Sequence, residues 1–381
     1  MGSSYRESDM TKIRLAYFSH DSISEGVGRS QILSLCRELS IAGVEVNLFS
    51  FEKIPPSLEL EDLVASSSIQ WKWFPFENGG TFPAISRINT LRKVKGDFDV
   101  IHARGDLPAF AAVLRNEEPV LWDIRSLWTE QKKVLNPRRF NILARTIIES
   151  MNKFTSRRVS AYNTLTNAIT EVIREKYPRL PKNHSVVSTC VDTNLFKLEP
   201  HFPKIPVGLL SGTFNSIYDS QLITEFNQYV IENFGHRILW IRGFESGDVI
   251  KDLGQQEIIS GQYDDVARFV AQSSYGISVC RNDLGDSLKA AMPTKIAEFL
   301  SVGRPVIVNS LLGDVKELLI ENNVAVALDS KSDIPTAAQQ LINLLSDPTT
   351  PSRCRQMAEK AFSLKYATKQ FIALYESISL A

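Results

Sequence analysis

Residues 292–309 read Met292-Pro293-Thr294-Lys295-Ile296-Ala297-Glu298-Phe299-Leu300-Ser301-Val302-Gly303-Arg304-Pro305-Val306-Ile307-Val308-Asn309. This stretch decides the fold, because it places a short predicted helix between the strand-like runs Ser274–Cys280 and Pro305–Asn309. Pro293 suits the first turn of a helix, where a missing N–H is no loss, and Gly303 suits the helix end. Strand–helix–strand units of this kind build parallel sheets.

The start of this helix is the first candidate binding site. Thr294 and Lys295 lie in its first turn, where free N–H groups and the helix dipole favour a phosphate. Glu298 follows one turn later on the same face, and a carboxylate there can accept two hydrogen bonds from a ribose diol. The pattern therefore indicates a nucleotide-diphosphate site. An ordinary αβ unit with a surface Lys–Glu pair explains this helix, taken alone, equally well.

The composition is that of a globular chain with more than one core. The chain has 381 residues, 43% of them hydrophobic and 23% charged, which suits two domains. Its 43 basic and 43 acidic residues cancel, so we expect no nucleic-acid partner. The four cysteines form no CxxC pair, which argues against a zinc site. We find no signal peptide and no apolar run of membrane-spanning length, and we expect a cytoplasmic protein.

Apolar runs alternate with amphipathic stretches along the chain, which predicts an α/β fold of two doubly wound, Rossmann-like domains facing a central cleft. The expected divisions are a first domain over 1–195, a linker over 196–206, a second domain over 207–363 and a C-terminal helix over 364–381. The other predicted strands are Ile13–Ser19, Val44–Phe51, Ile69–Pro75, Val100–His102, Val120–Ile124 and Ala161–Leu165 in the first half, and Val207–Gly212, Arg237–Ile241, Glu257–Ser260 and Val324–Leu328 in the second.

Several segments, in this order, resemble the GT-B glycosyltransferases, in particular the family-4 group of retaining enzymes that use nucleotide sugars. They are Gly26–Gln31, Asp99–Arg104, Trp122–Trp128, Val191–Phe196, Met292–Asn309 and Gly313–Val315, and together they span nearly the whole chain. The resemblance implies the GT-B fold, with the C-terminal helix crossing back to the first domain. It also implies a nucleotide-sugar substrate, no separate cofactor and no metal, since the chain lacks a DxD-type carboxylate pair in a suitable loop.

In the second half, the resemblance assigns Glu298 to the donor ribose. Ala290 stands where relatives have a second glutamate near the sugar. Arg281 and Asp283 in the preceding loop are candidate replacements for that glutamate, and a solvated loop explains them equally well.

Further donor contacts implied by the resemblance are Gly212 and Thr213 in the diphosphate turn, Gly261 and Tyr263 in the base loop, and Thr294 at the helix start. The basic pair that relatives often carry after the diphosphate turn is absent. Lys295 and Arg242 are therefore the candidates that compensate the phosphate charge. Hydrogen bonds from helix ends alone would leave part of the negative charge of the diphosphate uncompensated, which is energetically costly in a cleft. For Arg242, an exposed arginine without a ligand is the alternative.

In the first half, Gly26, Gly28 and Arg29 form a loop that lets the backbone approach a phosphate or an acceptor, although a simple turn also explains it. His102 ends a predicted strand at the cleft edge, and the resemblance makes it the candidate catalytic residue near the transferred sugar. A capped structural histidine is the alternative. Asp123 and Arg125 follow on the next strand as sugar contacts or as a structural ion pair.

The segment 130–158 is basic and amphipathic, with Lys132, Lys133, Arg138, Arg139, Arg145, Lys153, Arg157 and Arg158. Such a segment suits peripheral contact with a membrane that carries a lipid-linked acceptor. A solvated helix packed on the first domain is the more frequent explanation.

These observations predict a glycosyltransferase that moves a sugar, with retention, from a nucleotide-sugar donor to the hydroxyl of a glycan, lipid-linked or small-molecule acceptor. A nucleotide-sugar epimerase of similar fold would need further acid and histidine groups around the sugar. An inactive GT-B partner subunit is favoured by Ala290 and opposed by the Lys295–Glu298 helix.

Overall fold

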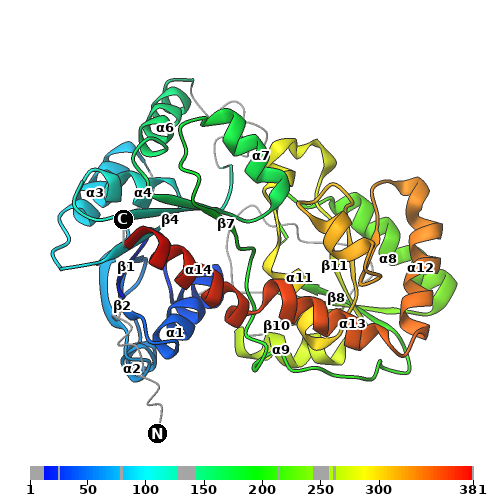
Figure 1. Cartoon of the computed structure of the whole chain (residues 1–381). Coiled ribbons are helices and arrows are strands. Elements are labelled where there is room, and N and C mark those ends of the chain that lie inside the picture. The colour runs from blue at the N-terminus through cyan, green and yellow to red at the C-terminus, as the bar shows by residue number, and fades with distance from the viewer. Residues whose placement is uncertain are drawn as a thin grey trace, which may run out of the picture.

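The computed structural model describes residues 13–24, 26–77, 80–127, 130, 142–212, 214–242, 257–260 and 263–379. These residues form two lobes, each a parallel sheet flanked by helices (Figure 1). The predicted α/β architecture of two doubly wound domains is confirmed.

The first sheet has the order β3-β2-β1-β4-β5-β6-β7. Its strands are β1 Arg14–Ser19, β2 Glu45–Glu52, β3 Gln70–Pro75, β4 Val100–Arg104, β5 Val120–Ile124, β6 Ala161–Thr164 and β7 His184–Val186. The sequence did not predict β7, because this short strand is exposed to half-buried and carries no apolar alternation. β4 runs past its predicted end at His102 to Arg104, which changes the position of His102 relative to the cleft.

Helices cover both faces of this sheet. They are η1 Gly28–Leu33, α1 Ser34–Ile41, α2 Leu58–Ser66, α3 Thr81–Arg92, α4 Asp106–Val113, α6 Ile142–Thr155 and α7 Asn167–Lys176. Leu35, Cys36 and Leu39 of α1 are buried in one cluster with Ile32, so this helix packs on the sheet through one apolar face.

The second sheet has the order β10-β9-β8-β11-β12-β13, with β8 Val207–Ser211, β9 Arg237–Arg242, β10 Glu257–Ser260, β11 Tyr275–Ser278, β12 Val306–Val308 and β13 Ala325–Ala327. Its helices are α8 Ser220–Phe234, α9 Tyr263–Gln272, η2 Asn282–Leu284, α10 Asp286–Lys289, α11 Thr294–Val302, η3 Lys316–Ile320, η4 Lys331–Asp333, α12 Ile334–Ser346, α13 Thr350–Met357 and η5 Ala358–Phe362. α11 is buried from Lys295 onward. Its Phe299 packs so closely on Gly276 of β11 that a Cβ there would lie 2.2 Å from the ring.

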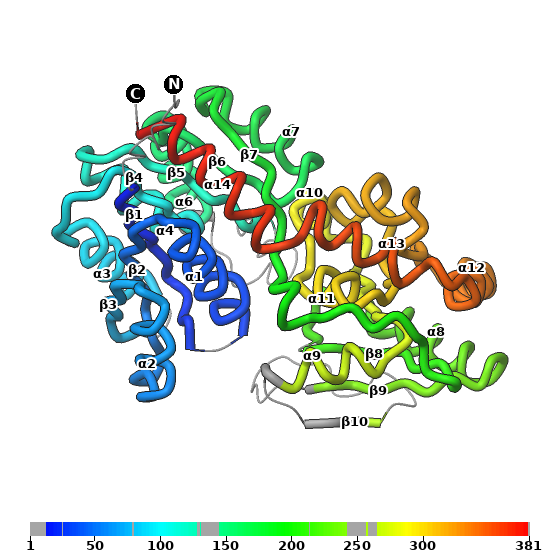
Figure 2. Tube along the Cα trace, turned by 60° about the horizontal axis from the view of Figure 1, so that its bottom comes forward, coloured from blue at the N-terminus to red at the C-terminus, as the bar shows by residue number. Residues whose placement is uncertain are grey.

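The chain crosses between the lobes after β7 and again at Ser363, and these crossings pair with each other. Val191 N–H donates to Phe362 O at 2.7 Å, and Leu364 N–H donates to Val191 O at 3.1 Å. α14 Leu364–Ser379 then runs across the first domain beside α1, as Figure 2 shows. Its Phe371 is buried in the same apolar cluster as β1 and α1. The C-terminal helix therefore forms part of the first domain's core.

A second set of contacts holds the lobes together beside the cleft. The carboxylate of Asp314 accepts hydrogen bonds from Asn167 N–H at 2.6 Å and Ala168 N–H at 2.9 Å, at the start of α7. Thr166 Oγ1 donates to Lys289 O at 2.6 Å. An anion at a helix N-terminus is favoured by the helix dipole, so Asp314 of the second domain stabilises this arrangement of the lobes.

Candidate active site

A cleft of about 1030 Å³ lies where the carboxyl ends of the two sheets face each other. Its walls include Ser211 at the end of β8, Arg104 at the end of β4 and the start of α11. In both sheets the strand order reverses here, between β1 and β4 and between β8 and β11. Ligands of doubly wound sheets bind at this switch point.

Lys295 on the second-domain wall is a buried cation without a hydrogen-bond partner for Nζ. Its ammonium lies over the rings of Phe214, at 3.8 Å from the centroid, and Tyr218, at 4.4 Å. Burial lowers the pKa of Lys295 to about 7. A cation with unused donors at the edge of a cleft needs an anionic acceptor, and a phosphate supplies one.

Glu298, one turn further along α11, lines the cleft beside Lys295. It is only 8% exposed, and burial raises the pKa of its carboxyl to about 7, against the opposing effect of Lys295. Among the described residues its carboxylate accepts no hydrogen bond. Thr294 and Lys295 lie in the first turn of α11, which has no side-chain cap, and both residues line the cleft. The structure therefore brings together Thr294, Lys295 and Glu298, the three residues of α11 that were predicted to bind the nucleotide sugar.

Other predicted donor residues have different positions. Gly212 lines the cleft with φ +77°, a conformation that favours glycine. Arg281 and Asp283 pair with each other on an exposed loop and are not among the residues lining the cleft. Thr213 and Gly261 lie outside the described residues, as do the side chains of Arg242 and Tyr263.

Ala290, which replaces the family's sugar-side glutamate, lies in the cleft wall, together with Ser287 one turn earlier on α10. Ser287 Oγ is buried and has no hydrogen-bond partner. Ser287 is therefore the polar residue of the cleft wall that lies closest in sequence to Ala290. Sequence reasoning missed Ser287, because a serine in a short helix has no distinguishing pattern.

The two glycines of the first-domain loop have different roles. Gly26 lines the cleft with φ +53°, and a Cβ on it would meet no atom within 4 Å. A Cβ on Gly28 would lie 1.7 Å from the carbonyl oxygen of Ser22. Gly28 is therefore required for packing against the protein's own backbone, which corrects the prediction that it approaches a ligand. Arg29, next to it, lines the cleft.

Glu52 anchors the segment before this loop and was not predicted. Its buried carboxylate accepts hydrogen bonds from Ile23 N–H at 3.0 Å and Ser24 Oγ at 2.6 Å. It also accepts from Ser22 Oγ and Ser50 Oγ. A carboxylate with this many donors fixes the backbone of residues 22–24.

His102 does not reach the cleft. It is 0% exposed within β4, its Nδ1 lies 2.6 Å from the hydroxyl of Tyr375 on α14, and its ring packs on Tyr17 and Phe371. Its Nε2 lies 3.3 Å from Asp123 Oδ2, and burial lowers the pKa of the imidazole. The expectation that this histidine points into the cleft is therefore wrong, because β4 continues to Arg104 and α14 covers the other side of the ring.

Asp123 is likewise fully buried, and it holds the arginines that do reach the cleft. Its carboxylate lies 3.6 Å from Arg104 Nη1 and 3.4 Å from Arg125 Nη1, and it accepts a hydrogen bond from Asn163 Nδ2 at 2.8 Å. Arg104 and Arg125 both line the cleft. Sequence reasoning missed Arg104, although its place at the carboxyl end of a buried strand was the signal that could have found it.

Tyr375→Phe tests the structural role of His102. Removing the hydroxyl deletes its hydrogen bond to Nδ1, so we expect the free energy of unfolding to fall by about 1 kcal/mol, with unchanged nucleotide affinity. The matched control is Tyr366→Phe on the same helix, whose hydroxyl has no hydrogen-bond partner among the described residues. Equal stability of the two variants in denaturant unfolding would contradict the prediction.

Solved structures with this fold include sucrose-phosphate synthase from Thermosynechococcus elongatus, at 14% identity and TM-score 0.70 over 96% of this chain and 99% of that one. HepE from Anabaena, solved with UDP and glucose, matches at 14% identity and TM-score 0.66 over 96% and 99% of the two chains. Residues 26–195 match the family model described as Glycosyltransferase Family 4. The whole chain thus has the GT-B fold, and its first domain matches a glycosyltransferase family.

A putative UDP-N-acetylglucosamine 2-epimerase from Listeria monocytogenes also has this fold, at 16% identity and TM-score 0.58 over 97% of each chain. At that identity the likeness concerns the fold alone. A comparison with curated proteins finds no match to the sequence.

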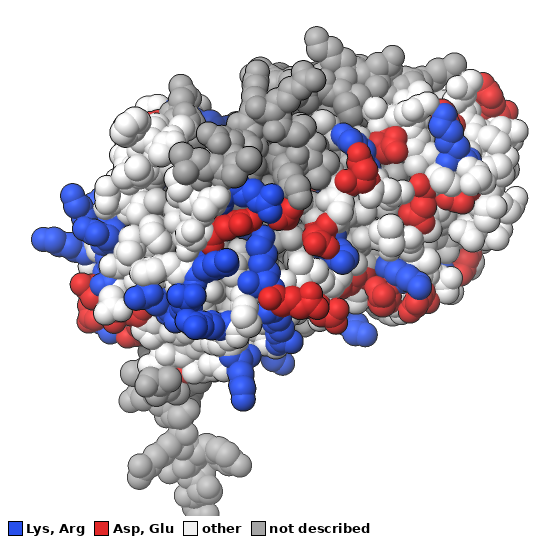
Figure 3. All heavy atoms as spheres, turned by 90° about the horizontal axis from the view of Figure 1, so that it is seen from above, with Lys and Arg blue, Asp and Glu red and all other residues white. Residues whose placement is uncertain are grey.

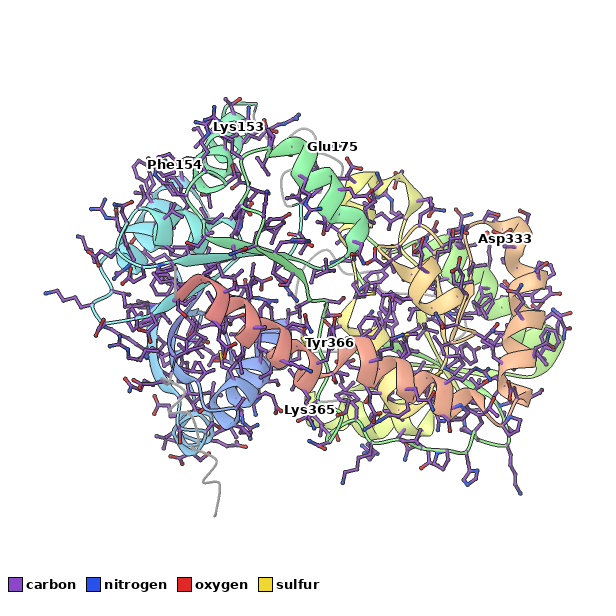
Figure 4. The ribbon with its side chains drawn as sticks, viewed as in Figure 1. Lys153, Phe154, Glu175, Asp333, Lys365 and Tyr366 are labelled. Atoms are coloured by element: carbon purple, nitrogen blue, oxygen red, sulfur yellow. The ribbon has the colours of Figure 1, made fainter. Side chains whose placement is uncertain are left out.

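The basic segment 130–158 is described only in part, since residues 131–141 lie outside the described residues. In α6, Phe154 packs on Phe110 of α4, with ring centroids 5.7 Å apart, while Lys153 is exposed (Figure 4). Figure 3 shows lysines and arginines gathered over the first domain. The contact of Phe154 favours a helix packed on the domain. None of the described helices has the length and apolar character needed to cross a membrane.

Proposed function

We propose that this glycosyltransferase transfers a sugar, with retention, from a nucleoside-diphosphate sugar bound at the start of α11 to an acceptor hydroxyl held by the first domain. The observation that carries this proposal is that Lys295 and Glu298 lie together at the cleft, both buried, and that Lys295 Nζ has no hydrogen-bond partner. A diphosphate supplies the acceptor that Lys295 lacks, and a ribose diol supplies the donors that Glu298 lacks.

The arrangement supports a leaving-group-assisted mechanism. Lys295 and the first N–H groups of α11 stabilise the negative charge that develops on the leaving diphosphate. A phosphate oxygen then takes the proton of the attacking hydroxyl on the same face of the sugar, which retains the anomeric configuration. His102 is too deeply buried to take part. Ser287 is the candidate hydrogen-bond donor to the sugar in place of the glutamate that Ala290 replaces.

A screen of nucleoside diphosphates by thermal shift tests the donor site. UDP is the first ligand to test, because HepE is solved with UDP and with UDP-glucose. We expect one nucleoside diphosphate to raise Tm in a concentration-dependent way, since a ligand at 100 times its Kd stabilises the folded state by about 2.7 kcal/mol. Failure of every nucleotide to raise Tm would overturn the proposal.

Product analysis tests the reaction itself. We expect the transferred sugar to keep the anomeric configuration of the donor in the NMR spectrum of the product. Conversion of the donor sugar to its epimer without an acceptor would indicate an epimerase. Nucleotide binding without transfer to any acceptor would indicate an inactive partner subunit.

A further inference from the structure

Three arginines lie on the first-domain wall of the cleft. Arg29 at the start of η1, Arg104 at the end of β4 and Arg125 just after β5 all line the cleft. The carboxylates associated with them are Asp123, which pairs with two of the arginines, and Asp21, whose Oδ2 lies 3.9 Å from Arg104 Nε. Glu59, exposed on α2, lines the same wall, and no ion pair joins it to these arginines among the described residues.

The same arginines have unused hydrogen-bond donors. The Nε atoms of Arg104 and Arg125 are buried and have no acceptor. The Arg104 side chain is only 6% exposed, so water cannot readily satisfy it. The guanidinium of Arg29 has no partner among the described residues. Buried donors in native proteins are nearly always paired, and guanidinium forks match the oxygens of phosphate and carboxylate groups.

We propose that the acceptor carries a phosphate or carboxylate group, and that Arg29, Arg104 and Arg125 hold this group while its neighbouring hydroxyl is glycosylated. The inference rests on the proposed function, which places the donor on the opposite wall at Lys295 and Glu298. The cleft volume of about 1030 Å³ leaves room for a second ligand beside a nucleotide. Thr189 Oγ1, buried without a partner in the same cleft, offers a further donor.

The competing assignment gives the arginines to the donor diphosphate, since the basic pair usual after the diphosphate turn is absent from the sequence. Two measurements separate these assignments. If the arginines hold the acceptor, their loss weakens binding of an anion that is added beside a bound nucleotide. If they hold the donor, their loss weakens binding of the nucleoside diphosphate itself.

The experiment is calorimetric titration of inorganic phosphate into the full-length protein saturated with the nucleoside diphosphate found in the screen. We expect saturable phosphate binding that Arg29→Gln and Arg125→Gln each weaken by about tenfold or more, the scale of a lost hydrogen bond to a charged group. Nucleoside diphosphate affinity should remain within about twofold of the parent's. The matched control is Arg37→Gln on α1, which replaces an exposed arginine that is absent from the cleft wall.

Phosphate binding that is absent, or equal in the control and the two test variants, would overturn the proposal. A loss of nucleotide affinity in the arginine variants would assign these arginines to the donor site, and this result would also overturn the proposal. The proposed function fails separately: if no nucleotide binds but phosphate binding still needs Arg29 and Arg125, the anion site stands and the donor site falls.

The anionic group belongs either to a lipid headgroup or to a soluble acceptor, and flotation distinguishes these sources. The probes are vesicles of phosphatidylcholine alone and vesicles in which phosphatidylcholine is mixed with an equal amount of phosphatidic acid. If the protein floats with the vesicles that contain phosphatidic acid, and Arg29→Gln and Arg125→Gln abolish this flotation, the result supports a lipid phosphate. Flotation that is absent or unaffected by these variants, together with arginine-dependent phosphate binding, supports a soluble anionic acceptor.

Discussion

Glu298→Gln and Lys295→Ala are each expected to weaken nucleoside diphosphate binding by about 1–3 kcal/mol, or roughly 5- to 150-fold in Kd. The reason is that each variant removes a buried charged group that lines the cleft and would hydrogen-bond the nucleotide. Calorimetry measures the effect. Asp283→Asn is a suitable control, because Asp283 pairs with Arg281 at an exposed position and is not among the residues lining the cleft.

The pH dependence separates the two residues. Both groups have a pKa of about 7 in the free protein. A diphosphate binds to the protonated Lys295, so affinity should fall as pH rises above 7. A ribose diol donates to the ionised Glu298, so affinity should fall as pH drops below 7. Lys295→Ala should remove the alkaline fall, and Glu298→Gln should remove the acid fall.

The phosphates of UDP are also protonated as pH falls, so they too can weaken UDP binding on the acid side. Uridine has no phosphate and therefore shows the effect of Glu298 alone. If UDP is the ligand that the screen identifies, uridine should keep the acid fall that depends on Glu298 and lose the alkaline fall that depends on Lys295. Unchanged UDP affinity in both variants, with the fold intact, would remove the donor-site assignment.

Local signals in the sequence were enough to predict α11. Pro293 and Gly303 bound the predicted helix, and α11 indeed ends before Gly303, which takes the left-handed conformation with φ +88°. The long apolar strands were also predictable, because buried parallel strands are nearly continuous apolar runs. β7 was not, since it is short and lies at the edge of the sheet with little burial.

Long-range packing explains why the position of His102 could not be predicted. Its environment is set by Tyr375, which lies 273 residues later in the chain, and no periodicity around β4 reveals that contact. The same limit applies to Gly28, where the sequence shows a glycine but not whether ligand or backbone approaches it. Local patterns specify elements, whereas the partners of a buried polar side chain come from the tertiary fold.

Asp123→Ala is expected to cause the largest loss of stability, about 3–5 kcal/mol in the free energy of unfolding. The variant leaves Arg104 and Arg125 without the carboxylate that lies 3.6 and 3.4 Å from them. The control is Asp97→Ala, since Asp97 pairs with Arg14 at an exposed position, and pairs of that kind contribute about 0–1 kcal/mol. Denaturant unfolding at pH 7 measures both variants.

The pH dependence of the Asp123 effect has a definite sign. Burial alone would raise the pKa of this carboxyl, but Arg125, His102 and Arg104 together hold the pKa well below its usual range. A carboxyl with a lowered pKa in the folded state stabilises the fold above its unfolded pKa, near 3.9, and loses that contribution as pH falls further. The stability gap between the parent and Asp123→Ala should therefore be constant near neutral pH and narrow below about pH 4. A gap that stays constant into acid, or a loss no larger than that of Asp97→Ala, would show that the two cleft arginines do not depend on Asp123.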